Sequence, residues 1–142
     1  MDAVVKQVSG MTFIGRADTK HWVPMDGPPE FGGTDAANRP MELILISLAG
    51  CSASDVSSIL AKKRAKLRTM EVNVHADRAD DHPRVFTNIH MEYVFYGQGL
   101  KPADIERAIA LSQDKYCSVS AMLRKAVDIT HSYRIVEEGS SE

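Results

Sequence analysis

The chain has 142 residues, 44% of them hydrophobic and 25% charged, with a formal net charge of −2 at pH 7. This length predicts one domain, or two intertwined copies of the chain acting as one. The slightly acidic balance gives no global attraction to nucleic acid or to anionic membranes. Only 2 cysteines are present, which excludes a disulfide-stapled secreted scaffold and leaves either inert core thiols or a redox pair.

The N-terminal part of the chain predicts short strands. Residues 1–5 lack the basic and apolar regions of a secretion signal, so a cytoplasmic protein is the expectation. Strands are expected at residues 3–8, 11–16 and 20–25, with turn residues between them. Residues 26–40 are rich in glycine and proline and predict a long irregular loop, and such loops often carry function.

Residues 40–66 predict one long helix, with Pro40 in its first turn and four basic residues near its end. The segment is about long enough to span a bilayer. Glu42, Asp55 and several serines favour a buried core helix instead, and we expect no membrane partner. A helix this apolar in so short a chain predicts burial on more than one side, which a second copy would supply. Its expected core stripe consists of Leu45, Ala49, Ala53, Val56 and Leu60.

The remaining segments predict further strands and helices. Strands are expected at residues 71–76 and 86–96, joined by a turn at residues 80–83. Helices follow at residues 101–112 and 118–126, and a last strand covers residues 128–136. Clustered strands separated by clustered helices predict an α+β fold with mainly antiparallel sheets, in a single domain over residues 1–142.

Cys51 lies in the middle of the long predicted helix, away from its expected core stripe. On the same side lie Ser47, Ser54, Asp55 and Ser58, and small neighbours leave room for a ligand to reach the sulfur. The carboxylate of Asp55, one turn away, tends to raise the pKa of a thiol rather than lower it. Asp55 either tunes the thiol or accepts hydrogen bonds from nearby serines.

Cys117 directly precedes a predicted helix and follows Lys115 and Tyr116. Free amides at the helix N-terminus and the nearby lysine predict a lowered thiol pKa. Composition alone leaves two inert, buried cysteines as an equal alternative. The five histidines are scattered and no HExxH or CxxC spacing is present, so no metal site is expected. The basic run at residues 62–68 indicates a solvated helix end rather than a nucleic-acid site.

Two cysteine motifs resemble those of a known family. Residues 40–43 and 48–56 read Pro-Met-Glu-Leu and Leu-Ala-Gly-Cys-Ser-Ala-Ser-Asp-Val, and residues 112–119 read Ser-Gln-Asp-Lys-Tyr-Cys-Ser-Val. These motifs, their spacing and the order of elements resemble the OsmC/Ohr family. Residues 10–13 and 129–133 are similar to its YhfA-like branch.

The resemblance implies an intertwined homodimer with antiparallel sheets and a long central cysteine-bearing helix. It also implies a peroxiredoxin-like, thiol-dependent reduction of organic hydroperoxides in defence against oxidative stress. Cys51 matches the thiol that attacks the peroxide, and Cys117 matches the thiol that resolves the product. An external dithiol would restore both thiols, with no metal or cofactor.

The resemblance further implies a carboxylate–arginine pair at the start of the central helix. The family pattern is Pro-Glu, whereas here Met41 follows Pro40 and the carboxylate is Glu42. Glu42 with Arg16 is the expected catalytic pair, and Arg39 is the alternative arginine. Expected substrate contacts are Ser47, Ser54, Asp55 and Phe31. The departure keeps a second reading open: a non-catalytic dimer that binds a small apolar or thiol-reactive ligand at its interface.

Overall fold

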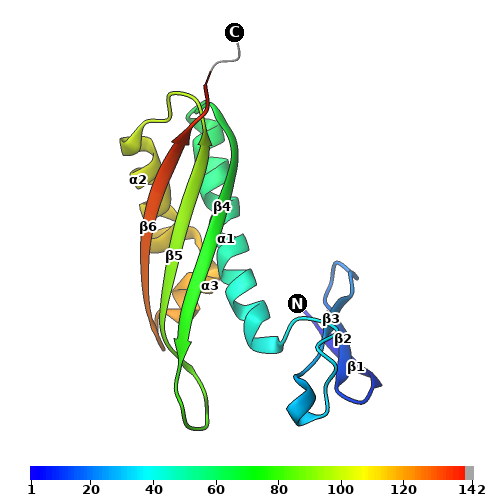
Figure 1. The fold of residues 1–142 in the computed structure, drawn as a ribbon. Coiled ribbons are helices and arrows are strands. Elements are labelled where there is room, and N and C mark those ends of the chain that lie inside the picture. Colours follow the sequence, from blue (N-terminus) through cyan, green and yellow to red (C-terminus); the bar gives the residue numbers. More distant parts are fainter. Residues whose placement is uncertain (140–142) are drawn as a thin grey trace. The chain divides into compact units, whose positions relative to one another are not determined.

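The computed structural model describes residues 1–139, which form two compact units divided between Leu45 and Ile46. Figure 1 shows the course of the chain through both units. The fold is α+β, as the sequence predicts.

The first unit contains a small antiparallel sheet. Strands β1 (Val4–Ser9), β2 (Thr12–Arg16) and β3 (Val23–Met25) lie in that order and confirm the three predicted strands. Gly10 adopts a φ of 54° between β1 and β2, a conformation that suits glycine in a tight turn. Every residue of β1 is exposed in the isolated chain, so this sheet leaves an uncovered strand.

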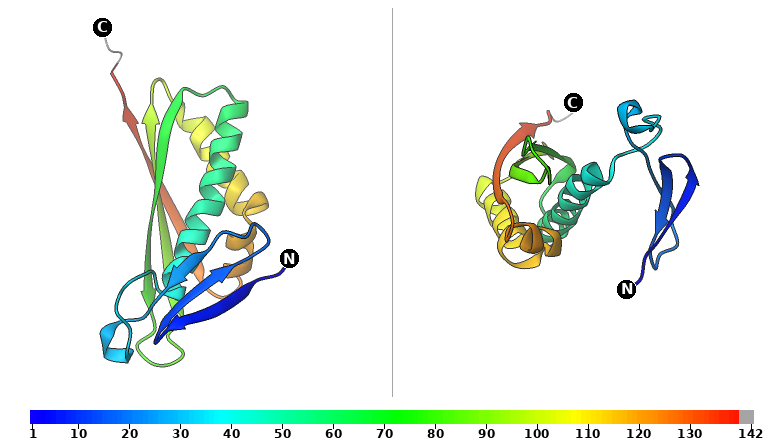
Figure 2. Two further views of the ribbon diagram at one scale, coloured as in Figure 1. Left: turned by 90° about the vertical axis from the view of Figure 1, so that its right-hand side faces the viewer. Right: turned by 90° about the horizontal axis from the view of Figure 1, so that it is seen from below.

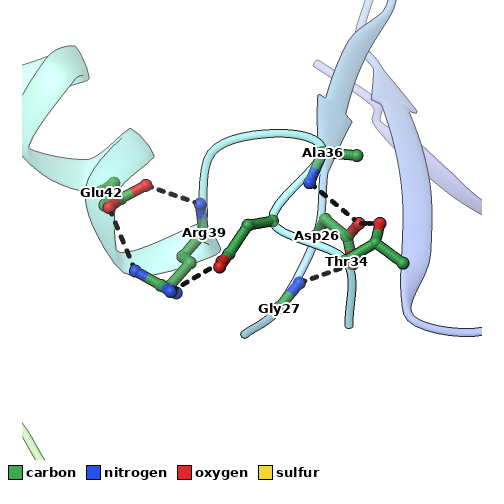
Figure 3. A network of polar contacts seen from close by, with 7 residues as sticks. Asp26, Gly27, Thr34, Ala36, Arg39 and Glu42 are labelled. Carbon is green, nitrogen blue, oxygen red and sulfur yellow. Dashed lines mark hydrogen bonds and ion pairs between the residues drawn. The ribbon is translucent and has the colours of Figure 1, made fainter. Parts of the chain in front are cut away.

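The glycine- and proline-rich loop after β3 is held together by one buried carboxylate. Asp26 is 3% exposed and accepts hydrogen bonds from Thr12 Oγ1 (3.3 Å) and Thr34 Oγ1 (2.6 Å). It also accepts from the backbone N–H groups of Gly27 (2.7 Å) and Ala36 (3.2 Å), as Figure 3 shows. These bonds, that of Thr34 above all, lower the pKa of Asp26 to about 2. The loop is irregular, yet its backbone is fixed by hydrogen bonds.

The second unit packs helices on one face of a three-stranded sheet, as both views in Figure 2 show. Its strands lie in the order β4-β5-β6, with β4 and β5 antiparallel and β5 and β6 parallel. The parallel pair arises because two helices form a crossover between β5 and β6. The elements are α1 (Pro40–Lys62), which belongs to this unit from Ile46 on, β4 (Leu67–Arg78), β5 (Phe86–Gly97), α2 (Pro102–Leu111), α3 (Ser118–Leu123) and β6 (Asp128–Glu137).

The core lies between β5 and the helices. Alternate β5 residues Ile89, Met91, Tyr93 and Phe95 are almost fully buried, and α1 contributes Leu48, Ser52, Val56 and Leu60. These α1 residues follow i, i+4 spacing and make one row on the helix. The predicted stripe is therefore correct at Val56 and Leu60 but wrong at Ala49 and Ala53, which lie beside the row. As a result, Cys51 lies next to the buried row rather than opposite it.

Two helices end earlier than their sequences predict. Helix α1 ends at Lys62, because Arg64 adopts a φ of 56°. The N–H groups of Arg64 and Ala65 then bond to the carbonyls of Ala61 (3.0 Å) and Leu60 (3.1 Å). This is a Schellman motif, usually marked by a glycine that is missing here. Helix α3 likewise ends at Leu123 and not at residue 126.

Helix α1 is long and apolar enough to cross a membrane by length and composition, with a mean hydropathy of 1.7 in its most apolar window. In the fold, one row of the helix is buried, and Ile46 on another side is 53% exposed. The isolated chain thus leaves apolar surface of α1 uncovered.

Candidate active site

Two thiols and one carboxylate meet in the second unit. Cys51 Sγ, Cys117 Sγ and a carboxylate oxygen of Asp55 all lie within 4.8 Å of one another. Cys51 and Asp55 are one turn apart on α1, so they share a side of that helix. Cys117 reaches them from the residue that precedes α3, and both cysteines are free thiols.

Cys117 is the buried member of the pair. It is 2% exposed and caps α3, with its Sγ accepting a hydrogen bond from Ser120 N–H at 3.3 Å. Burial raises the pKa of Cys117 to about 11, against the smaller opposing effect of the Ser120 hydrogen bond. The predicted lowering of this pKa is therefore wrong, and Lys115 lies instead over the ring of Tyr116, 5.3 Å from its centroid. Asp55 adds to the raised pKa of Cys117.

We expect the free energy of unfolding to fall as the pH rises through the titration of Cys117. The folded protein holds this proton more tightly than the unfolded chain, where the pKa returns to 9.0. The contribution to stability is therefore complete below about pH 9 and lost toward about pH 11. Urea unfolding of the wild-type protein and of Cys117→Ala at several pH values measures this contribution. If the free energy of unfolding changed equally with pH in the two proteins, the raised pKa of Cys117 would be contradicted.

A buried chain of hydrogen bonds ends on Asp55. Ser112 Oγ donates to Asp55 Oδ2 at 3.1 Å, which uses its single hydrogen. The 2.8 Å bond between Ser52 and Ser112 must then be donated by Ser52, and the 2.6 Å bond between Tyr93 and Ser52 by Tyr93. Gln113 Nε2 donates to Tyr93 Oη at 2.8 Å. The hydroxyl hydrogens of Tyr93, Ser52 and Ser112 therefore all point along this series of bonds toward Asp55.

The other end of this series of hydrogen bonds lies at α3. Gln113 Oε1 accepts hydrogen bonds from Ser120 Oγ (2.7 Å) and from the guanidinium of Arg124 (3.2 Å). The chain therefore runs from a cation to a carboxylate through side chains that are almost completely buried. Burial also raises the pKa of Tyr93, which keeps its phenol a donor. We name Arg124, Gln113, Tyr93, Ser52, Ser112 and Asp55 the polar chain.

A π-helical turn places two members of the polar chain. Ser112 and Gln113 begin this turn, η2 (Ser112–Tyr116), and both are buried. Such turns are rare and often occur at functional sites. Neither residue was expected at the site from the sequence. Their position five and four residues before Cys117, as two polar residues at the end of an apolar helix, is the signal that could have indicated them.

A surface cavity of about 410 Å³ adjoins Asp55. Its walls combine apolar groups with two lysines, and its lining residues are Asp55, Ser58, Ile59, Lys62, Lys63, Leu111 and Tyr116. A volume of a few hundred Å³ suits a small organic molecule. The cavity therefore offers a ligand an approach to the carboxylate beside the thiols.

Residues 33–132 match the family profile described as OsmC-like protein. The chain belongs to the OsmC-like family. This OsmC-like protein is 46% identical to Protein YhfA of Escherichia coli K12 over 136 residues, which cover 96% of this chain and 98% of YhfA.

Solved structures share the fold of this OsmC-like protein. An OsmC-like protein from Mycoplasma pneumoniae superposes with a TM-score of 0.82 at 15% identity, over 96% of each chain. An organic hydroperoxide resistance protein OsmC from Legionella pneumophila superposes with a TM-score of 0.66 at 19% identity, over 94% of this chain and 96% of the other. At these identities the likeness establishes the fold alone.

The predicted substrate residues of the OsmC-like protein differ in their placement. Asp55 lies beside the thiols. Ser47 and Ser54 are exposed, and the hydroxyl of Ser54 donates to the carbonyl of Gly50 at 2.9 Å, a bond within α1. Phe31 belongs to the first unit and is 67% exposed. Contact of Ser47, Ser54 and Phe31 with a substrate stays a prediction.

The predicted catalytic pair also belongs to the first unit. Glu42 accepts a hydrogen bond from the backbone N–H of Arg39 at 2.8 Å, and its carboxylate lies 3.6 Å from the guanidinium of Arg39, as Figure 3 shows. Arg16 instead lies over Trp22, with 4.7 Å between its guanidinium carbon and the ring centroid. Within this unit, the alternative arginine is the partner of Glu42. A catalytic role for Glu42 and Arg16 stays a prediction.

Proposed function

We propose that this OsmC-like protein is a thiol-dependent peroxidase that reduces organic hydroperoxides, with Cys51 as the attacking thiol and Cys117 as the resolving thiol. The observation that carries the proposal is the approach of the two sulfur atoms to within 4.8 Å, with both thiols free. A disulfide needs sulfur atoms about 2 Å apart, so a modest local movement is enough to join them.

The proposed reaction has three steps. The thiolate of Cys51 attacks one oxygen of the hydroperoxide, the O–O bond breaks, and the organic fragment leaves as an alcohol after taking a proton. Cys51 becomes a sulfenic acid, which Cys117 attacks to form a disulfide with release of water. An external dithiol then reduces the disulfide by exchange. The sum is one hydroperoxide and one dithiol converted to an alcohol, water and one disulfide.

The burial of the two thiols supports this division of roles. Cys51 is partly exposed, so a peroxide can approach it, whereas Cys117 is 2% exposed. Burial raises the pKa of Cys117 to about 11, which makes it a poor thiolate toward a substrate at neutral pH. Cys117 reacts only when a sulfenic acid forms next to it, and Asp55 is then the adjacent carboxylate that accepts its proton.

The proposal includes a cytoplasmic homodimer. The uncovered strand β1 and the exposed apolar side of α1 support a second copy of the chain as the partner. In such a dimer, an arginine and a carboxylate from the first unit would assist peroxide binding. Glu42 with Arg16 or with Arg39 are the two candidate pairs, and the 3.6 Å ion pair favours Arg39.

A stoichiometric titration tests the peroxidase. Reduced protein is titrated with cumene hydroperoxide while free thiols and intact mass are followed together. We expect both thiols to disappear at about one equivalent, with a mass decrease of about two hydrogens. Thiols that stay unchanged under a large excess would contradict the proposal.

A non-catalytic role is the alternative, a dimer that binds a small apolar or thiol-reactive ligand. The raised pKa of Cys117 and the cavity beside Asp55 favour it. It predicts that a bound ligand raises the unfolding temperature without consumption of the ligand. Turnover of hydroperoxide would contradict it.

A further inference from the structure

The two thiols and Asp55 form a set of metal donors that no metal-binding motif in the sequence indicates. Cys51 and Asp55 lie one turn apart on α1, and Cys117 comes from a distant segment. Each offers one donor atom, and all three atoms lie within 4.8 Å of one another. Thiolate sulfur with a carboxylate oxygen is a donor set that suits zinc and other thiophilic divalent cations.

Two of these donors are oriented by hydrogen bonds from outside the set. Ser112 Oγ donates to Asp55 Oδ2 at 3.1 Å, and Ser120 N–H donates to Cys117 Sγ at 3.3 Å. Such second contacts fix the direction of a ligand and are typical of metal centres. Ser112 and Ser120, which donate these hydrogen bonds, are themselves held by the buried side chains of Ser52 and Gln113. The three metal donors are therefore more rigidly placed than surface groups that meet by chance.

We propose that the reduced thiol pair and Asp55 bind one thiophilic divalent cation, zinc above all, with water from the adjoining cavity as the fourth ligand. Tetrahedral zinc holds two thiolate sulfurs about 3.8 Å apart at bond lengths of about 2.3 Å. The sulfur atoms, at most 4.8 Å apart in the structure, reach this separation with a shift of about 1 Å or less. The inference needs only the three donors and does not depend on peroxidase activity.

Metal binding and disulfide formation exclude each other at this site. The same two sulfur atoms either hold the ion as thiolates or bond to each other, and oxidation of both thiols removes two of the three ligands. The cation would therefore protect the reduced pair, and a peroxide that oxidised the pair would release the cation.

Titration with Co²⁺ tests the site directly. The protein is reduced, freed of reductant and kept anaerobic, and its absorption spectrum is followed as Co²⁺ is added. We expect thiolate-to-cobalt charge-transfer absorption and tetrahedral d–d bands that saturate at one ion per chain, and Zn²⁺ should abolish both. Asp55→Asn should weaken binding at least about tenfold. The charge-matched control Asp81→Asn, in the exposed turn between β4 and β5, should leave it unchanged.

Two results would overturn the proposal. One is a reduced wild-type protein that shows no charge-transfer band, and the other is equal Co²⁺ affinity in Asp55→Asn and Asp81→Asn. Alkylation of the wild-type thiols should abolish the band without any substitution, which separates loss of ligands from misfolding of a variant. Co²⁺ binding without peroxide consumption would contradict only the peroxidase. Peroxide consumption without Co²⁺ binding would contradict only the metal site.

Discussion

Cys51→Ser should abolish hydroperoxide consumption by the reduced protein. The serine hydroxyl is not a thiolate and cannot attack the O–O bond, and the buried Cys117 cannot replace it as the attacking thiol. We expect the rate with cumene hydroperoxide and excess dithiol to fall at least about a thousandfold, in line with losses of other enzyme nucleophiles. Ser57→Ala, a change at an exposed position on the same helix, should keep the wild-type rate.

The companion variant Cys117→Ser separates attack from resolution. It should consume about one equivalent of peroxide and then stop, with a sulfenic acid on Cys51 that dimedone traps and mass spectrometry locates. Continued turnover by Cys117→Ser with the same dithiol would remove the resolving role. Trapping of the sulfenic acid on Cys117 in the wild-type protein would reverse the two assignments.

Gln113→Leu should lower the free energy of unfolding by about 2–3 kcal/mol, because it leaves buried hydrogen-bonding groups without partners. Gln113 accepts from Ser120 and Arg124 and donates to Tyr93. Ser120 is completely buried and cannot turn to water after the substitution. Urea unfolding monitored by circular dichroism measures the change.

Gln98→Leu is the matched control for this effect. Gln98 is exposed at the end of β5, so the same change in side chain should alter the free energy of unfolding by less than about 0.5 kcal/mol. If Gln113→Leu proved as stable as Gln98→Leu, the polar chain would contribute nothing to holding the second unit together.

The elements of the fold follow from the sequence because hydrophobic periodicity and turn residues are local signals. The order of strands and helices was predicted correctly on that basis. The early end of α1 was not, since Arg64 occupies a position where glycine usually marks the stop. The parallel pairing of β5 with β6 was also missed, because pairing depends on where a crossover returns the chain. The expectation of a single domain over residues 1–142 stays a prediction.

The site was predictable in its reactive groups but not in its electrostatics. Resemblance of the two motifs indicated that Cys51 and Cys117 act together, and the fold brings them close. The predicted direction of the shift in the Cys117 pKa was wrong. Local sequence shows the helix N-terminus, which lowers a thiol pKa, but it does not show the burial, which raises the pKa more. The polar chain joins side chains from α1, β5, η2 and the residue that follows α3, so no single window of sequence contains it.

The orientation of one amide gives the interior of the second unit a fixed polarity. Arg124 can only donate, so it holds the oxygen of Gln113 toward itself and turns the NH₂ group toward Tyr93. An NH₂ group cannot accept, so Tyr93, Ser52 and Ser112 cannot reverse their hydrogens while this amide stays in place. The side chains behave as a one-way line of dipoles whose positive ends face Asp55. Asp55 fixes the same direction from the other end, so an Arg124→Met protein would lose one of the two charged groups that align these hydroxyls, without a change in any residue that touches sulfur.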